Sequence, residues 1–450
     1  MMARFRNLIN WPTRVAWAKG DRKSAQSMPD ISVMPPPRRF TVQLSPVSLT
    51  YDQLMLAVCM ALLGVGLLMT QSADARIGHL VHDYFVRLVL NVEAVHAVLA
   101  MVLLVFLWRL DYRRLIGRSL MRSAPAMLVL VSLICLALVL TRLGTDINGA
   151  KRWLMLRIGS HALSFEPSEL AKWSLVLFIS AYAVHKGEQI RNFWKGFVPL
   201  MVVVGATSAL ILKEDFGTAA LVAGIAVLLM LMAGCRWWHI AMLLPPALVV
   251  LYFAVWHVPY RRERLMIFMH PHLDPKGAGY NPIQSLLSFA SGGFWGRGLG
   301  DGIQKMGYLP EDNTDFIFSL IAEELGFFGC MMVILLYLTL LFSGWQTGRR
   351  ARDLFGKLIA FGCTGMIGLQ AAMNIAVVTV TVPTKGIALP LISSGGTGWI
   401  LTAGAIGLVM SVERVNRLEA GVRHSNESSA GRAPLEFNLA EKEPAGAGAL

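Results

Sequence analysis

The chain has 450 residues, of which 55% are hydrophobic and only 15% are charged, and its formal net charge is +13. Apolar runs long enough to cross the roughly 30 Å hydrocarbon core of a bilayer recur along it, which excludes a soluble globular protein. The basic residues lie between these runs, where they set membrane topology, and this placement argues against a nucleic-acid partner. The composition therefore predicts a polytopic membrane protein.

Two polar tails flank the apolar part of the chain. Residues 1–50 are basic and include the stretch MPPPRR, and residues 416–450 are rich in Ala, Gly, Glu and Asn. Both segments hold too few apolar residues to bury a core, so we expect flexible tails, the second of them disordered. The first apolar run is too long for the apolar part of a signal peptide, which indicates a retained membrane anchor.

About ten apolar runs lie between the tails. They can be drawn at 53–71, 92–108, 124–141, 169–185, 195–212, 217–234, 238–257, 315–344, 357–379 and 387–411. Runs of this length favour helices over the strands of a β-barrel, which need only about ten alternating residues each. We therefore expect an all-α fold with about ten transmembrane helices over residues 51–415.

Lys and Arg cluster in alternate connections between these runs. They fill the N-terminal tail and two of the connections, which contain Arg109, Arg113, Arg114, Arg118 and Arg122 after the second run and Arg349, Arg350, Arg352 and Lys357 after the eighth. Cytoplasmic segments collect these residues, so both termini should be cytoplasmic. The connections near 142–168 and 258–314 then lie outside, the second as a large extracytoplasmic loop between helices 7 and 8.

The stretch FEPSELAK predicts a helix start. Pro167 suits the first turn, where its missing N–H costs nothing, and Glu169 and Lys172 lie three residues apart on one helical face. The simpler interpretation is a capping turn with a local ion pair. An ionisable pair at a membrane edge is also typical of a functional site, and the two interpretations are compatible.

The stretch KEDFGTAA, residues 213–220, joins two closely spaced apolar runs. Asp215 precedes Phe216 and Thr218, and this order predicts an N-cap for the second of the two helices. We therefore expect a supporting role for Asp215.

The long connection 258–314 has no obvious secondary structure in its sequence, and such loops are usually functional or disordered. Its glycines and aromatic residues argue against disorder. Asp274 lies between prolines and glycines in HPHLDPKGAGYN, which predicts an Asx-turn. Arg261 and Arg264 precede it and Lys276 follows it, so the carboxylate lies among cations that could hold a phosphate. A single base beside an anion site is a plausible arrangement for glycosyl transfer.

Six motifs follow one another along the chain: FEPSELAK, DFGTA, DPKGAGYNPIQS, ASGGFWGRGLG, LPEDNTDFIFSLIAEELGFFG and VPTKGIALPLISSGG. In their order and spacing they resemble the SEDS family (shape, elongation, division and sporulation). The resemblance covers roughly residues 50–415. It implies a ten-helix peptidoglycan glycosyltransferase that polymerises lipid II on the outer face of the bacterial inner membrane.

The resemblance also implies roles for particular residues. Asp274 matches the essential loop aspartate of the family, Glu169 and Lys172 match the charged residues of its PSExxK helix, and Lys385 matches the lysine of TKG. A lysine at this position resembles the pattern of the division branch of the family more than that of the elongation branch. The resemblance therefore implies septal cell-wall synthesis. It also implies a class B penicillin-binding protein with transpeptidase activity and other divisome proteins as partners.

Three positions depart from the family pattern. Glu166 stands where the family usually has Gln, Glu214 where it commonly has Pro, and Ser394 where it has Tyr. Trp399, which follows soon after, is also unexpected. These departures leave Asp274, Glu169, Lys172 and Lys385 in place.

The chemistry of sugar transfer fits the residues in these motifs. The acceptor hydroxyl must lose a proton as it attacks the anomeric carbon, and Asp274 would act as the general base. The departing undecaprenyl pyrophosphate would be stabilised by Lys172, Lys385 and an arginine such as Arg261 or Arg264. Glu169 could hold a divalent cation, Mg²⁺ or Mn²⁺, since Mg²⁺ often bridges phosphates through one or two carboxylates. A single displacement of this kind inverts the anomeric centre.

Three alternatives remain open. The chain could be an elongation polymerase of the same family, a lipid II flippase or transporter, or an inactive scaffold. A transporter would need charged residues along a path through the bilayer, whereas the polar residues here gather at one face. Proteoliposomes that follow either polymerisation or movement of labelled lipid II would separate these functions.

Overall fold

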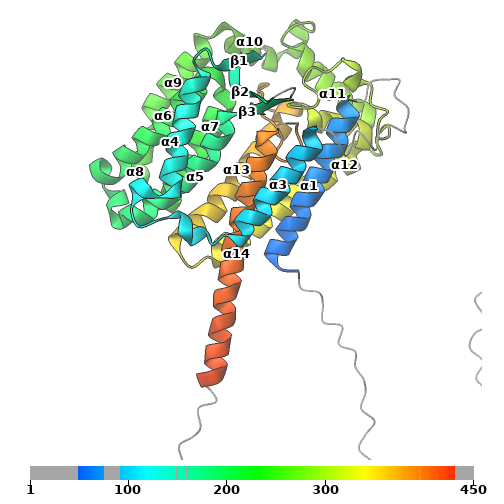
Figure 1. Ribbon diagram of the computed structural model, residues 1–450. Coiled ribbons are helices and arrows are strands. Elements are labelled where there is room, and N and C mark those ends of the chain that lie inside the picture. The colour runs from blue at the N-terminus through cyan, green and yellow to red at the C-terminus, as the bar shows by residue number, and fades with distance from the viewer. Residues whose placement is uncertain (1–48, 75–91, 148–149, 159–160, 395, 431–450) are drawn as a thin grey trace, which may run out of the picture. The chain divides into compact units, whose positions relative to one another are not determined.

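A computed structural model describes residues 49–74, 92–147, 150–158, 161–394 and 396–430, and all structural statements below refer to these residues. Helices make up most of the described chain (Figure 1). The α-helices are α1 (Tyr51–Asp74), α3 (Val92–Arg109), α4 (Ala124–Val139), α5 (Pro167–Lys186), α6 (Val198–Glu214), α7 (Phe216–Met232), α8 (Trp237–Ala241), α9 (Leu244–Trp256), α10 (Pro259–Met269), α11 (Tyr280–Gly292), α12 (Ile317–Arg350), α13 (Leu354–Val378) and α14 (Thr397–Ala430). Short 3-10 turns lie at Tyr112–Leu115, Leu120–Arg122, Gly187–Arg191, Pro271–Leu273 and Gln304–Met306, and a π-helical turn at Phe193–Phe197.

The apolar helices confirm the predicted all-α membrane fold. Seven helical segments are long and apolar enough to cross a membrane: α1, α3, Phe193–Glu214 with α6, Trp237–Trp256 with α8 and α9, α12, α13 and α14. The helices α4 and α7 are apolar but shorter. The remaining predicted run forms α5, which carries Glu169 and Lys172 and is buried along most of its length.

Helix α14 forms the centre of the packing. It contacts α1, α3, α5, α12 and α13. In its membrane segment 78% of the residues are buried, against 6% for the α8–α9 segment. Small residues allow this close approach, because a Cβ at Gly407 would lie 2.4 Å from the Leu104 carbonyl oxygen of α3. The side chains of the α8–α9 segment are therefore mostly exposed on the surface of the described chain.

A three-stranded antiparallel sheet lies at one end of the helices, which we call the sheet end (Figure 1). Its strands are β1 (Gly144–Ile147), β2 (Ala150–Ile158) and β3 (His161–Phe165), with β2 in the middle. The Lys151 N–H of β2 donates to Glu214 Oε2 at 3.0 Å. The sheet is thereby fixed to the turn between α6 and α7.

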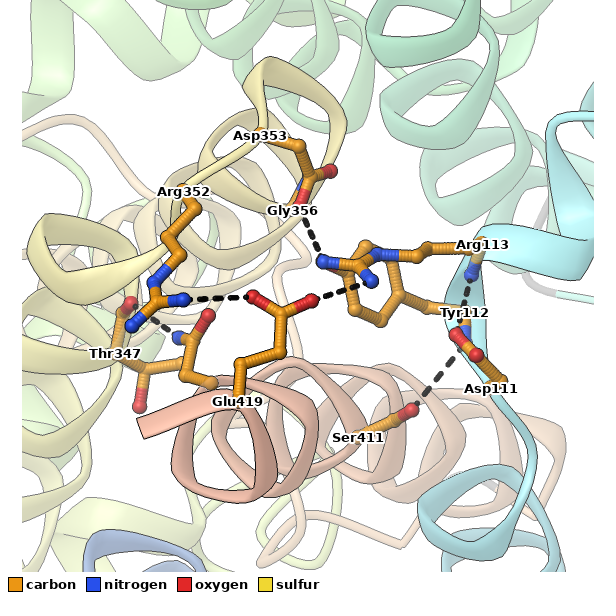
Figure 2. A network of polar contacts seen from close by, with 10 residues as sticks. Asp111, Tyr112, Arg113, Thr347, Arg352, Asp353, Gly356, Ser411 and Glu419 are labelled. Atoms are coloured by element: carbon orange, nitrogen blue, oxygen red, sulfur yellow. Dashed lines mark hydrogen bonds and ion pairs between the residues drawn. The ribbon is translucent and has the colours of Figure 1, made fainter. Parts of the chain in front are cut away.

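A charged network holds the opposite end, which we call the arginine end and define by Arg113, Arg352 and Arg417. Figure 2 shows the Glu419 carboxylate of α14 between Arg113 and Arg352, at 2.6 and 3.3 Å. The Arg417 guanidinium makes two hydrogen bonds, of 3.1 and 3.0 Å, to the buried Asp52 carboxylate of α1. These contacts connect α14 to α1 and to two turns between helices.

The segment 293–309 is fixed to α12 where that helix is broken. Gly326 has φ 66° and ψ −161°, a conformation that only glycine adopts readily. The N–H groups of Arg297 and Gly298 donate to the carbonyls of Glu323 and Glu324, both at 3.0 Å. These two hydrogen bonds hold the segment against the break in α12.

A buried ion pair completes this attachment. Lys305 Nζ lies 2.8 Å from Glu324 Oε1, and both side chains are almost fully buried. Ser72 of α1 donates to the same carboxylate at 2.8 Å, and the Gly300 N–H donates to it at 3.0 Å. The carboxylate is thus fully hydrogen-bonded, as a buried charge requires.

The structure corrects two of the sequence predictions. The last predicted run, 387–411, is helical only from Thr397, because Pro390 and the left-handed Leu391 (φ 65°) keep the chain before it out of a helix. The connection 258–314 contains α10 and α11, although its sequence showed no obvious secondary structure.

The predicted tails fall largely outside the described residues. This holds for residues 1–48 and 431–450. Helix α14 continues to Ala430, beyond residue 415, the predicted end of the membrane domain.

Candidate active site

A polar cavity of about 270 Å³ lies at the sheet end. Side chains from β2, α5, α7, α13 and α14 line it, together with the segments before α12 and before α14. Its charged lining residues are Arg152, Glu166, Glu169, Asp215, Arg264, Glu311 and Asp315, of which Arg264 belongs to α10. Segments far apart in the sequence therefore supply one site.

The predicted pair of Glu169 and Lys172 lies at this cavity. Lys172 Nζ is 2.6 Å from Glu169 Oε1 and 2.8 Å from Gln370 Oε1, and the lysine is 1% exposed. Gln370 in turn donates to the Ala388 carbonyl at 2.8 Å. The pair satisfies the buried lysine, and Glu169 itself lines the cavity.

Asp215 caps α7, as its position in the sequence predicts. Its two oxygens accept from the Thr218 N–H at 3.1 Å and from the Thr218 hydroxyl at 2.9 Å. Arg152 of β2 lies 3.4 Å from Asp215 and donates to the Glu214 carbonyl at 3.2 Å. The Asp215 carboxylate thus caps α7, pairs with Arg152 of the sheet and lines the cavity.

The predicted phosphate-binding cations occupy different places. Arg264 lines the cavity and donates to the Thr384 carbonyl at 3.2 Å. Arg261 donates to the carbonyls of Ala254 and Leu212, both at 3.1 Å. Lys385 Nζ and the Arg261 guanidinium lie 4.8 and 5.7 Å from the centre of the Phe216 ring. Burial lowers the pKa of Lys385, and the nearby Asp215 carboxylate opposes this shift.

Asp274 forms the predicted turn. Its carboxylate accepts from the Gly277 N–H at 3.0 Å and from the Ala278 N–H at 2.9 Å. A Cβ at Gly277 would lie 2.0 Å from Asp274 Oδ2, so the turn requires glycine there. Among the described residues, those that line the cavity do not include Asp274.

Four charged residues of the cavity had no role in the sequence interpretation of catalysis: Arg152, Glu166, Glu311 and Asp315. Burial raises the pKa of Asp315 to about 7, helped by Glu311 and opposed by Arg152. Burial also raises the pKa of Glu166 to about 7, helped by Glu169 and opposed by a hydrogen bond from Ser168. The stretches KRW and EDNTDF contain three of the four, and their dense charge next to apolar runs was the available signal.

Carboxyl groups outnumber cations in the cavity lining, five against two. Even so, no three His, Cys, Asp or Glu side chains of the described residues come together as a metal site. Glu169, the predicted metal ligand, is already ion-paired with Lys172. A divalent cation at Glu169 stays a prediction, and no step below is derived through one.

Comparison with known proteins identifies the family. A family model described as "Cell cycle protein", covering FtsW, RodA and SpoVE, matches residues 52–418. The probable peptidoglycan glycosyltransferase FtsW of Geobacter metallireducens is 36% identical over 365 residues, which cover 80% of this chain and 94% of that protein. The protein of the same name from Aliivibrio salmonicida is 38% identical over 295 residues, which cover 65% of this chain and 72% of that protein.

Solved structures agree with this match. A chain of a peptidoglycan synthase complex for polymerization and crosslinking superposes with a TM-score of 0.65 at 30% identity, covering 80% of this chain and 97% of that one. The Rod shape determining protein RodA of Thermus thermophilus superposes with a TM-score of 0.57 at 28% identity, covering 82% of this chain and 98% of that one. Sequence, fold and coverage agree with the resemblance seen in the motifs, and the chain belongs to the FtsW, RodA and SpoVE family of cell cycle proteins, as a glycosyltransferase of the bacterial membrane.

Proposed function

We propose that this protein polymerises lipid II into glycan strands and releases undecaprenyl pyrophosphate. The observation that carries the proposal is the polar cavity at the sheet end, which lies within the region that matches the family and contains Glu169. The sheet end faces the outside of the cell, because the opposite end collects the arginines that mark cytoplasmic segments. Both termini are then cytoplasmic.

Asp274 is the general base of this proposal. An ionised carboxylate has about four lone-pair sites, and the turn uses two of them. The remaining lone-pair sites are open to the proton of the acceptor hydroxyl. The turn and the base role are therefore compatible.

The cations near the cavity stabilise the leaving pyrophosphate. Arg264 lines the cavity directly, and Lys172 is ion-paired with Glu169, which also lines it. Lys385 and Arg261 share the face of Phe216 and form a second group of cations. Each can strengthen its contact with the phosphate as negative charge develops in the transition state.

The proposed setting is the division septum. The relatives described above are named FtsW, which supports division over elongation, and Lys385 of the TKG motif supports the same branch. One solved neighbour belongs to a complex that couples polymerization and crosslinking. A class B penicillin-binding protein and other divisome proteins are the corresponding partners.

Asp274→Asn tests the catalytic part of the proposal. Asn keeps the size and the turn tendency of the side chain but cannot take the proton, so polymerisation should fall at least about a hundredfold in an assay with purified lipid II. Membrane insertion and binding of lipid II should stay near the parental level. Asp301→Asn, in the exposed segment between α11 and α12, is the matched control and should polymerise normally. Parental glycan chains from Asp274→Asn would exclude Asp274 as the base.

A further inference from the structure

A second hollow, entirely apolar, lies between α1 and α3, and we call it the α1/α3 groove. It has a volume of about 840 Å³. Its lining includes Met60, Gly64 and Leu67 of α1 and Ala94, Met101 and Phe106 of α3. Every described residue that lines it is apolar, so this lining suits a hydrocarbon chain better than a polar one.

The groove follows α3 for a length close to the depth of one leaflet. Its α3 wall extends from Ala94 to Phe106, which corresponds to about 18 Å of helix. One leaflet of the hydrocarbon core is about 15 Å thick. A lipid chain that starts at the sheet end could therefore lie in the groove over the full depth of its leaflet.

The sheet end of the groove adjoins the polar cavity. Ser394 lines the cavity and donates to Glu93 Oε1 of α3 at 3.2 Å. The His96 ring lies so close to Gly396 that a Cβ there would be 3.1 Å from it. Ala94 and Ala97 of the same helical turn line the groove. The first turn of α3 thus lines the apolar groove and contacts a residue that lines the polar cavity.

This arrangement matches a molecule with a polar head and one long hydrocarbon chain. We propose that the α1/α3 groove binds the polyprenyl chain of the lipid-linked substrate while its pyrophosphate and sugars occupy the cavity. The inference rests on the proposed function, because that function supplies a substrate with such a chain. A phospholipid chain bound in the groove, or a helix of a partner protein, would not take part in the transfer reaction.

Gly64→Leu narrows the groove without disturbing the helix. A Cβ at Gly64 meets no atom within 4 Å, so the added side chain enters open space and not the protein core. Gly205→Leu is the matched control, since Gly205 of α6 is also exposed and a Cβ there also meets nothing within 4 Å. Both substitutions favour the helix to a similar degree.

The test compares two substrates for the parent and both variants. One is lipid II with its undecaprenyl chain, and the other is the same head group on a diprenyl chain, which spans only about half of the groove. Gly64→Leu should raise the KM for the undecaprenyl substrate about tenfold, which is about 1.4 kcal/mol and close to the loss of two buried CH₂ groups. The KM for the diprenyl substrate should stay within about twofold of the parent, and Gly205→Leu should change neither.

The outcomes separate the occupants. If Gly64→Leu matches the parent on both substrates, the groove holds bulk phospholipid and the inference is wrong. If it weakens both substrates equally and loses the copurifying transpeptidase, a partner helix occupies the groove and the inference is also wrong. If the parent itself polymerises neither substrate while the transpeptidase is bound, the proposed function fails first and the inference falls with it.

A direct binding measurement gives a second readout. A polyprenyl pyrophosphate with a photoreactive group near the end of its chain should label peptides of α1 and α3 in the parent, and label them less in Gly64→Leu. Undecaprenyl phosphate should compete with this labelling, whereas phosphatidylglycerol should not. Equal competition by phosphatidylglycerol would show a groove without preference for the substrate chain and overturn the proposal.

Discussion

At the scale of single residues, the described residues that line the cavity include five carboxyl groups and two guanidinium groups. Burial raises the pKa of Asp315 and of Glu166 to about 7. Below that pH both carboxyls hold a proton and the cavity carries less negative charge. Above it they ionise and oppose an anionic head group.

Asp315→Asn should therefore flatten part of the pH dependence of substrate use. In the parent, the KM for lipid II should rise from about pH 6 to about pH 8 as Asp315 and Glu166 ionise. The Asn variant should lose part of that rise, and Glu166→Gln with Asp315→Asn should lose nearly all of it. KM measured across this range, with kcat recorded separately, checks the prediction. An unchanged profile in the double variant would mean that neither carboxyl titrates in the cavity.

The same pKa carries a consequence for stability. The pKa of Asp315 is raised in the folded protein, so ionisation disfavours the fold, and stability contributed by the protonated group is lost as the pH rises towards about 7. Asp315→Asn should remove this loss. Thermal unfolding at about pH 5 and about pH 8 should differ less for the variant than for the parent.

Variants of the buried Lys172 and Glu169 pair should separate effects on stability from effects on activity. Lys172→Met leaves the Glu169 carboxylate at the cavity without its cation and should lower stability by roughly 3–5 kcal/mol. Lys172→Met with Glu169→Gln should recover most of that stability, yet polymerisation should stay low because the cation is still missing. Thermal unfolding and polymerisation of the two variants, measured side by side, give the comparison. Full activity in the double variant would remove Lys172 from the substrate site.

At the scale of elements, the break in α12 shows what sequence periodicity could and could not predict. The membrane helices follow from their apolar runs, and the start of α5 follows from Pro167. The left-handed Gly326 gave no such signal, since a single glycine in an apolar run is common in membrane helices. The sheet was also missed, because its three short strands lie within one connection and pair only with each other.

Gly326→Ala should destabilise the attachment of segment 293–309. A Cβ at Gly326 would lie 2.3 Å from the Gly296 nitrogen, and the backbone there is unfavourable for alanine, which costs about 1–3 kcal/mol before the clash is counted. Gly205→Ala, at an open position of α6, should be neutral or slightly stabilising. Limited proteolysis of segment 293–309 and thermal unfolding test both. Parental protease resistance of Gly326→Ala would mean that α12 can straighten without releasing the segment.

At the scale of the whole described chain, α14 joins two ends with different tasks. At the sheet end its first turns line the cavity, and at the arginine end Glu419 and Arg417 hold neighbouring helices (Figure 2). The sequence shows charged residues in these segments but does not show which of them pair. Partners such as Asp52 and Arg417 are 365 residues apart along the chain. Long-range pairs of this kind become visible only in the folded chain.

Arg417→Gln should lower the melting temperature while leaving the chemistry intact. Asp52 is fully buried and would lose its cation, whereas the cavity lies at the other end of α14. Polymerisation at a temperature well below unfolding should remain within about twofold of the parent. Arg114→Gln, at an exposed position of the same end, serves as the control for charge alone. A large loss of rate in Arg417→Gln would show that the two ends are coupled.

The surplus of carboxyl groups in the cavity also sets a rule for the design of inhibitors. A phosphonate that imitates pyrophosphate would enter a space lined by five acid groups and two guanidinium groups. A compound with an amidine or guanidine could instead make charge-assisted hydrogen bonds to Glu169, Glu311 or Asp315. Cationic heterocycles should therefore be starting points for drug discovery against this protein in addition to mimics of its anionic product.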